Sequence, residues 1–136
     1  MRQDIIGLNN LKRSNMNNLE KEFIPYEQAL ALKELGFDEP CLCSWNFFTN
    51  ELNFNGQPST FSSEDVIQLP TFSQAFRWFR EKYKIRFIIQ SSMSDLGEYF
   101  KVIFPNGEQR GVSYNTYEEA ELACLNKLIE ICRGTS

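Results

Sequence analysis

The chain has 136 residues, with 12 phenylalanines, 4 cysteines, no histidine and a formal net charge of −4 at pH 7. This length suits one domain with a substantial apolar core. The negative charge argues against a general nucleic-acid binder, because contacts to phosphate require a positive surface. The charge is also uneven, since residues 1–70 carry 5 basic and 10 acidic side chains, whereas residues 71–136 carry 9 and 8. The acidic first half could face a basic groove on a partner or form a solvated surface.

No apolar run reaches the roughly 18 residues that a membrane crossing needs. Residues 1–18 are polar and rich in asparagine, unlike a signal peptide. We therefore expect a protein without membrane contact, located in the cytoplasm of whatever cell makes it.

Residues 1–22 are expected to form an N-terminal arm, because their asparagine-rich stretches resist regular structure. A single α+β domain is expected over residues 23–136. Its first helix lies within residues 23–37, where Pro25 suits the first helical position and Gly36 suits the residue after the last turn.

Residues 41–48 and 51–54 are rich in strand-forming side chains, and they predict a short hairpin that turns at residues 49–50. Asn55 and Gly56 indicate a further turn, and residues 57–65 indicate a polar loop.

The four cysteines are Cys41, Cys43, Cys124 and Cys132. The first two have C-x-C spacing, which fits zinc and redox motifs poorly in a chain without histidine. We favour reduced cysteines in the core over the two alternatives, a metal site or a disulfide.

Residues 70–133 predict the order helix, three antiparallel strands, helix. The first of these helices covers residues 69–83, with a capping box of Thr71 and Gln74. Its apolar stripe is Phe72, Ala75, Phe76, Phe79 and Tyr83. Strands are expected at residues 85–90, 99–104 and 109–114, with a turn at residues 105–107.

The last helix is the clearest in the sequence and covers Thr116–Arg133, with a capping box of Thr116 and Glu119. Helical spacing places one apolar face through Tyr117, Ala120, Cys124, Leu128 and Ile131. The predicted fold class is α+β: an antiparallel sheet with a three-stranded core, extended where it can be by the N-terminal hairpin, and helices packed on one face.

The densest basic cluster adjoins the helix at residues 69–83, and it consists of Arg77, Arg80, Lys82, Lys84 and Arg86. It could contact RNA phosphates or an acidic protein surface, or it could be the solvated face of an amphipathic helix. Trp78 falls off the apolar stripe, so it is either an exposed contact residue or packs under the hairpin or the arm. We take these six residues as the candidate partner-binding site.

The usual catalytic constellations are missing from the sequence. Without histidine, neither a Ser-His-Asp triad nor a Cys-His pair can form. The seven glycines are scattered and form no phosphate-binding loop. No acidic residue stands alone in an apolar strand, where a carboxylate metal-nuclease site is expected. We therefore predict a protein that is not an enzyme and has no catalytic, cofactor-binding or metal-binding residues.

The element order over residues 70–133 resembles that of the double-stranded RNA-binding domain. That family has a lysine-rich cluster at the start of its last helix, where it meets phosphates. This chain has Glu118 and Glu119 at that point, and two glutamates repel a phosphate backbone. The resemblance therefore implies a shared topology, with RNA binding as an alternative function.

Three further stretches resemble those of short uncharacterised proteins from Bacteroidetes phages and prophages. They are YEQALALKELGFDEPC at 26–41, FRWFREKY at 76–83 and TYEEAELACLNKLIE at 116–130. This resemblance implies a phage origin and transfers no catalytic motif. By analogy with small acidic phage proteins, it implies binding to a host protein or ribonucleoprotein, for example inhibition of a CRISPR effector nuclease.

Overall fold

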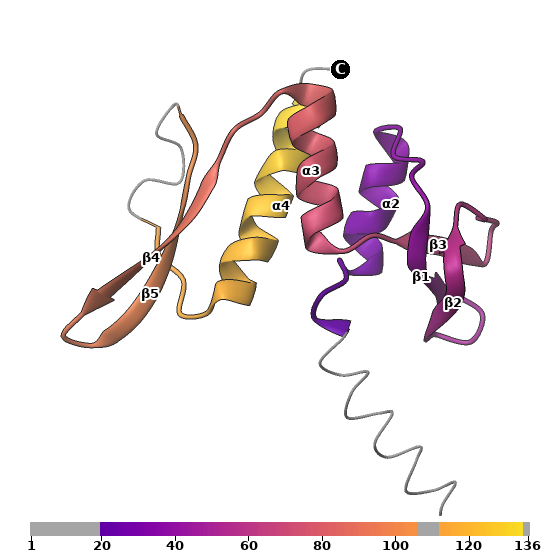
Figure 1. Ribbon diagram of the computed structural model, residues 1–136, viewed down its shortest axis with the longest axis horizontal. Coiled ribbons are helices and arrows are strands. Elements are labelled where there is room, and N and C mark those ends of the chain that lie inside the picture. Colours follow the sequence, from indigo (N-terminus) through magenta and orange to yellow (C-terminus); the bar gives the residue numbers. More distant parts are fainter. Residues whose placement is uncertain (1–19, 106–111, 135–136) are drawn as a thin grey trace, which may run out of the picture.

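Three helices lie between two antiparallel sheets in the computed structural model, which describes residues 20–105 and 112–134 (Figure 1). The elements are α2 (Tyr26–Glu34), β1 (Cys41–Asn46), β2 (Glu51–Ser59), β3 (Val66–Leu69), α3 (Phe72–Tyr83), β4 (Ile88–Ser94), β5 (Gly97–Ile103) and α4 (Tyr117–Gly134). The β4–β5 hairpin packs against α4, whereas the β2-β1-β3 sheet adjoins α2. The predicted α+β class, with helices on antiparallel sheets, is confirmed.

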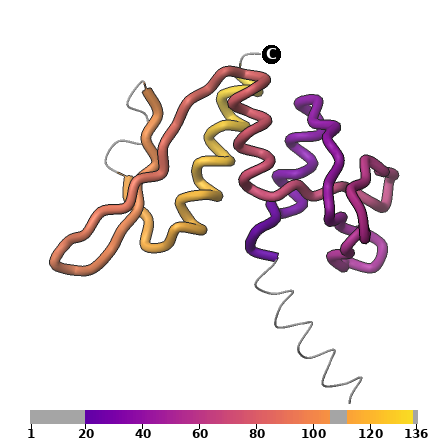
Figure 2. Tube along the Cα trace, viewed as in Figure 1, coloured from indigo at the N-terminus to yellow at the C-terminus, as the bar shows by residue number. Residues whose placement is uncertain are grey.

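The chain completes the first sheet before it enters α3, and it forms the hairpin before it returns along α4 (Figure 2). Residues 1–19, which make up most of the predicted arm, lie outside the described residues. So do residues 106–111, which hold most of the predicted turn and the first part of the predicted last strand.

Helices α2 and α4 run in the same direction. Gln28 Nε2 donates to Asn126 Oδ1 at 3.0 Å, and further along both helices Arg133 Nη2 donates to Glu34 Oε2 at 3.4 Å. Glu34 lies six residues after Gln28 on α2, and Arg133 lies seven residues after Asn126 on α4. Helices that ran in opposite directions could not make both contacts.

Helix α3 runs in that direction too. Before α2 begins, Ile24 N donates to Pro70 O at 3.0 Å, and Phe72 N donates to Glu22 O at 3.0 Å. Beyond the other end of α2, Lys82 Nζ donates to the carbonyl oxygen of Leu35 at 3.0 Å. The N-terminal ends of all three helices therefore lie at one end of the molecule (Figure 1).

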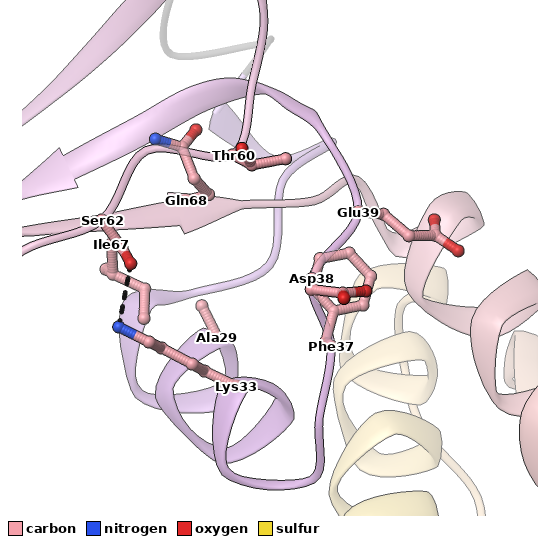
Figure 3. A pocket seen from close by; sticks show the side chains of 9 residues that line it. All are labelled: Ala29, Lys33, Phe37, Asp38, Glu39, Thr60, Ser62, Ile67 and Gln68. Carbon is pink, nitrogen blue, oxygen red and sulfur yellow. Dashed lines mark hydrogen bonds between the residues drawn. The ribbon is translucent and has the colours of Figure 1, made fainter.

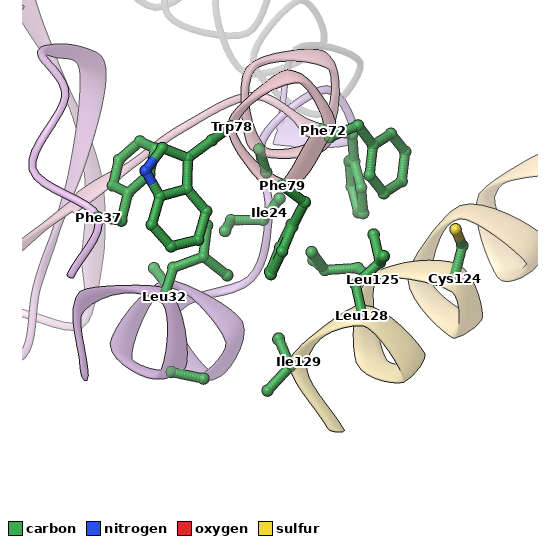
Figure 4. Close-up of a cluster of buried hydrophobic side chains, with 14 of the residues drawn as sticks. Ile24, Leu32, Phe37, Phe72, Trp78, Phe79, Cys124, Leu125, Leu128 and Ile129 are labelled. Atoms are coloured by element: carbon green, nitrogen blue, oxygen red, sulfur yellow. The ribbon is translucent and has the colours of Figure 1, made fainter. Parts of the chain in front are cut away.

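Phe79 is fully buried at the centre of the helical layer. Figure 4 shows its ring reaching from α3 into the space between Leu32 on α2 and Leu125 and Leu128 on α4. These three leucines are also fully buried. The stripe predicted along α3 is confirmed, because spacing by three and four residues turns its aromatic side chains towards one side.

The first sheet has β1 at its centre, paired antiparallel with β2 and with β3. The hairpin predicted at residues 41–54 is confirmed, but β2 continues to Ser59, and the strand Val66–Leu69 was not predicted. Asn55 and Gly56 do not end the strand. They lie where the β1–β2 register shifts, and the Asn55 amide nitrogen donates to Cys41 O at 3.0 Å and to Gln68 Oε1 at 2.8 Å. These hydrogen bonds join all three strands.

The second sheet is the hairpin of β4 and β5, with Ile88 opposite Ile103. Within the described part of the chain, the predicted last strand is reduced to one bridge, in which Phe100 and Tyr114 exchange backbone hydrogen bonds of 2.9 and 2.8 Å. The first strand begins at Ile88 rather than residue 85, because the segment after α3 must first cross from the helical layer to the hairpin.

Side-chain caps begin α3 and α4 as predicted. Thr71 Oγ1 accepts from Gln74 N at 3.0 Å, and Thr116 Oγ1 accepts from Glu119 N at 3.1 Å. The Gln74 side chain does not return to its cap, and it donates instead to the carbonyl oxygen of Pro40 at 2.9 Å. At α2, Pro25 is the N-cap rather than the first helical residue.

The buried face of α4 differs in part from the predicted one. Its buried side chains are Ala120, Cys124, Leu125, Leu128, Ile129 and Cys132. Tyr117 is 44% exposed, and its ring meets Phe100 edge to face at a centroid distance of 5.8 Å. Within residues 20–105 and 112–134, no helix combines enough length with enough apolar character to cross a bilayer.

We expect Phe79→Ala to lower the free energy of unfolding by about 3–5 kcal/mol, because it opens a cavity where all three helices meet. Urea denaturation followed by circular dichroism measures this change. Phe48→Ala is the matched control: Phe48 is 84% exposed, so its loss should alter stability by no more than about 0.5 kcal/mol. If Phe79→Ala does not fold, Phe79→Leu keeps the comparison quantitative. Equal losses at both sites would contradict the packing described here.

Candidate interaction surfaces

The predicted basic cluster is divided by the fold. Lys82 lies against the protein, where its ammonium donates to Leu35 O and stands 5.0 Å from the centre of the Trp78 ring. Arg77 is exposed and lies 3.6 Å from Glu39, so its charge is partly compensated. Neither side chain is fully available to a partner.

Trp78 belongs to the core and is only 6% exposed. Its ring meets Phe37, Phe79 and Tyr83 edge to face at centroid distances of 5.5, 5.1 and 5.6 Å. Of the two readings of Trp78, packing is therefore the one observed, although against the segment after α2 rather than under the hairpin or the arm. Trp78 lies off the main apolar stripe because α3 also packs against Phe37 in the segment after α2. The sequence pattern did not predict this contact.

Arg80, Lys84 and Arg86 are exposed, and their side chains make no hydrogen bond or ion pair with any other described residue. Lys84 ends α3 in the left-handed conformation with φ +58°. These three residues form what we call the basic face, at the C-terminal end of α3. This is the part of the predicted site that the structure brings together.

The four cysteines are free and buried. Burial raises the pKa of Cys41 and of Cys124 to about 12, and it raises the pKa of Cys43 and of Cys132 to about 11. These thiols are protonated at neutral pH and therefore weak nucleophiles. Within the ranges that the structure describes, no three cysteine, histidine or acidic residues are grouped to hold a metal ion.

A small pocket lies between α2 and the loop that precedes β3 (Figure 3). Lys33 Nζ crosses it and donates to Ser62 Oγ at 3.1 Å, while Asp38 and Glu39 line another side. Its volume of about 130 Å³ is well below the roughly 300–1,000 Å³ of typical small-molecule sites. The pocket is therefore too small for such a ligand.

Two larger hollows adjoin the segment that leads into α2. The first, of about 420 Å³, is called here the acidic hollow and is lined by Glu20, Lys21, Phe23, Pro25, Phe72, Thr116, Glu118 and Leu122. The second, of about 330 Å³, is lined by Glu20, Phe23, Ile24, Pro25, Tyr26, Trp45, Leu52 and Leu69. Both volumes fall within the range of ligand sites, and both hollows share Glu20, Phe23 and Pro25.

The acidic hollow is formed where three distant segments converge. Backbone hydrogen bonds fasten Glu22 and Ile24 beside the start of α3, and an isolated bridge pairs Phe23 with Thr71. The first two turns of α4 supply another wall through Glu118 and Leu122. No single stretch of the sequence carries this site, so sequence patterns do not predict it.

Negative charge dominates the edge of the acidic hollow. Glu20 and Glu118 line it, and Glu22 and Glu121 lie close enough to influence one another. Burial, followed by the charges of Glu22 and Glu118, raises the pKa of Glu121 to about 7. None of these four carboxylates is paired with a cation among the described residues.

No known protein family, curated protein or solved structure matches this chain.

All four thiols should resist a disulfide reagent such as DTNB in the native protein at pH 8, because each is buried and protonated. In urea the same reagent should titrate all four rapidly. The absorbance of the released thiolate measures both rates. A native thiol that reacted as fast as free cysteine would contradict the burial found here.

Glu121→Gln should stabilise the protein at pH 8 by about 1 kcal/mol, a value reduced by solvent screening of a partly exposed group. The ordinary pKa of 4.5 is raised to about 7 on folding, so the folded state binds more protons between these values. The free energy of unfolding of the native sequence therefore falls as the pH rises through that window.

Urea denaturation at pH 8 and pH 4.5 measures this effect, which should vanish at the lower pH. Glu119→Gln is the matched control, because Glu119 is exposed on the same helix but does not line the hollow. A stabilisation by Glu121→Gln that is the same at both pH values would show that the carboxylate charge is not its cause.

Proposed function

We propose that this chain is a non-enzymatic protein of a phage or prophage that acts in the bacterial cytoplasm by binding a host macromolecule. In its most specific form, the proposal is that the chain inhibits a nuclease effector of host defence, such as a CRISPR effector. The observation that carries the proposal is the separation of charge on the surface. The acidic hollow lies at the N-terminal end of α3, and the basic face lies at its C-terminal end.

The separation of charge gives the molecule a surface suited to binding an enzyme that acts on nucleic acid. Such an enzyme presents basic grooves to its substrate, and clustered carboxylates complement a basic groove. The basic face then projects from the other end of an α3 helix of 12 residues, a length of about 18 Å. One molecule could thus cover a nucleic-acid site with its acidic end and keep its basic end clear.

A plaque assay tests this proposal in cells that carry an active nuclease defence. Expression of the chain should raise the plating efficiency of a defence-sensitive phage by at least about tenfold. Glu118→Lys combined with Glu22→Lys should abolish that effect, because it reverses charge at the acidic end. Arg80→Glu combined with Lys84→Glu, the matched control at the other end, should retain it.

The result is interpretable only if each variant is folded and present at equal amounts, which immunoblots and thermal melts of the purified proteins establish. Full defence in the presence of the folded native protein, across a panel of nuclease systems, would contradict the proposal. Turnover of a substrate that a single side-chain change abolished would contradict its non-enzymatic part.

RNA binding is the second candidate function, and the exposed, unpaired Arg80, Lys84 and Arg86 favour it. A mobility-shift assay with duplex RNA and with guide-like RNA tests it directly. RNA contacts to these three residues would make the affinity fall steeply with salt, and reversing the three charges would flatten that dependence. The same reversal leaves the acidic hollow intact, so the assay separates this function from the first.

A further inference from the structure

The floor of the acidic hollow is apolar. Phe23, Pro25, Phe72 and Leu122 contribute to its lining, and at about 420 Å³ it can receive a large side chain with adjoining backbone. An exposed apolar hollow of this kind gains free energy when an apolar group covers it, because water leaves both surfaces. The shape of the hollow therefore selects an apolar anchor.

The edge of the hollow selects positive charge around that anchor. Glu20 and Glu118 line it, whereas Lys21 is the only cationic side chain that residues 20–105 and 112–134 contribute to its lining. Glu22 and Glu121 add two more carboxylates beside it. A cation at this edge would offset the charges of Glu22 and Glu118 that act on Glu121.

The same charges exclude other occupants. RNA phosphates and anionic lipid headgroups would add negative charge to a surface that already holds it in excess. A purely apolar ligand would cover the floor and leave the carboxylates without partners. A protein segment that carries an apolar side chain between basic residues satisfies both the floor and the edge.

We propose that the acidic hollow binds an exposed segment of a partner protein, with one large apolar side chain on Phe72 and Leu122 and flanking lysine or arginine residues on Glu20 and Glu118. This inference rests on the proposed function and names the class of partner surface that the acidic end recognises. The segment's cations pair with the carboxylates, while its apolar side chain displaces water from the floor.

Fluorescence anisotropy with a short labelled peptide tests the inference on the full chain. The peptide has one central leucine flanked on each side by arginines. One control peptide replaces the arginines with glutamates, and a second replaces the leucine with serine. We expect saturable binding of the first peptide and at least about tenfold weaker binding of each control.

Paired variants locate the site. Glu118→Lys should weaken binding of the arginine–leucine peptide about tenfold, whereas Glu119→Lys, one position along the same helix, should change it much less because adjacent helical side chains point apart. Leu122→Gln should weaken binding, and Leu96→Gln, at a fully exposed position outside the hollow, should not. Thermal melts establish that each variant is folded.

Protonation offers a further readout. The groups that interact with Glu121 are Glu22 from the segment before α2, and Glu118, Tyr117 and Cys124 from its own helix. Bound arginine favours the charged form of Glu121, so affinity should fall about threefold as the pH drops from 8 to 6. Glu121→Gln should remove that pH dependence.

Equal binding of the arginine and glutamate peptides, or equal effects of Glu118→Lys and Glu119→Lys, would overturn the inference. So would a concentration-dependent dimer that Glu118→Lys dissolved, because a second copy would then occupy the hollow. Peptide binding without any effect on host defence would contradict the proposed function alone. Relief of host defence without peptide binding would contradict this inference alone.

Discussion

The parallel alignment of the three helices is the constraint on which the other features depend. Phe79 reaches from α3 between α2 and α4, and its burial holds the three helices together. Hydrogen bonds at both ends keep them in register, from Ile24 to Pro70 and from Lys82 to Leu35. The two sheets then cover the outer sides of this layer.

Parallel helices bring three positive dipole ends together, and side-chain charges follow that polarity. The first turns hold Glu27 on α2 and Glu118 and Glu119 on α4, while the last turns hold Lys33, Arg80, Lys82 and Arg133. Acidic groups near N-terminal ends and basic groups near C-terminal ends stabilise each helix by up to about 1 kcal/mol apiece. The charge separation that supports the proposed function thus arises from the same arrangement that stabilises the helices.

At the acidic hollow, the negative charge exceeds what the positive dipole ends of the helices offset. Glu22 and Glu121 add negative charge beside Glu118, and the pKa of Glu121 rises to about 7 through burial and these neighbours. The charge of Glu121 lowers stability in the free protein, and the cations of the proposed partner segment would offset it. This excess of negative charge is what motivates the proposal that the acidic hollow binds a partner.

The sequence by itself determined the helices, the threonine caps of α3 and α4, the first hairpin and the α+β class, because periodicity, capping and turn residues are local. It left Trp78 open between an exposed contact and a packed side chain, because the burial of Trp78 depends on Phe37 from a distant segment, and it missed β3, a short strand that forms through its pairing with β1. Tertiary structure alone decided the parallel direction of the helices. It also created the acidic hollow, because Phe23, Phe72 and Glu118 are far apart in the sequence and meet only when the helix ends are aligned.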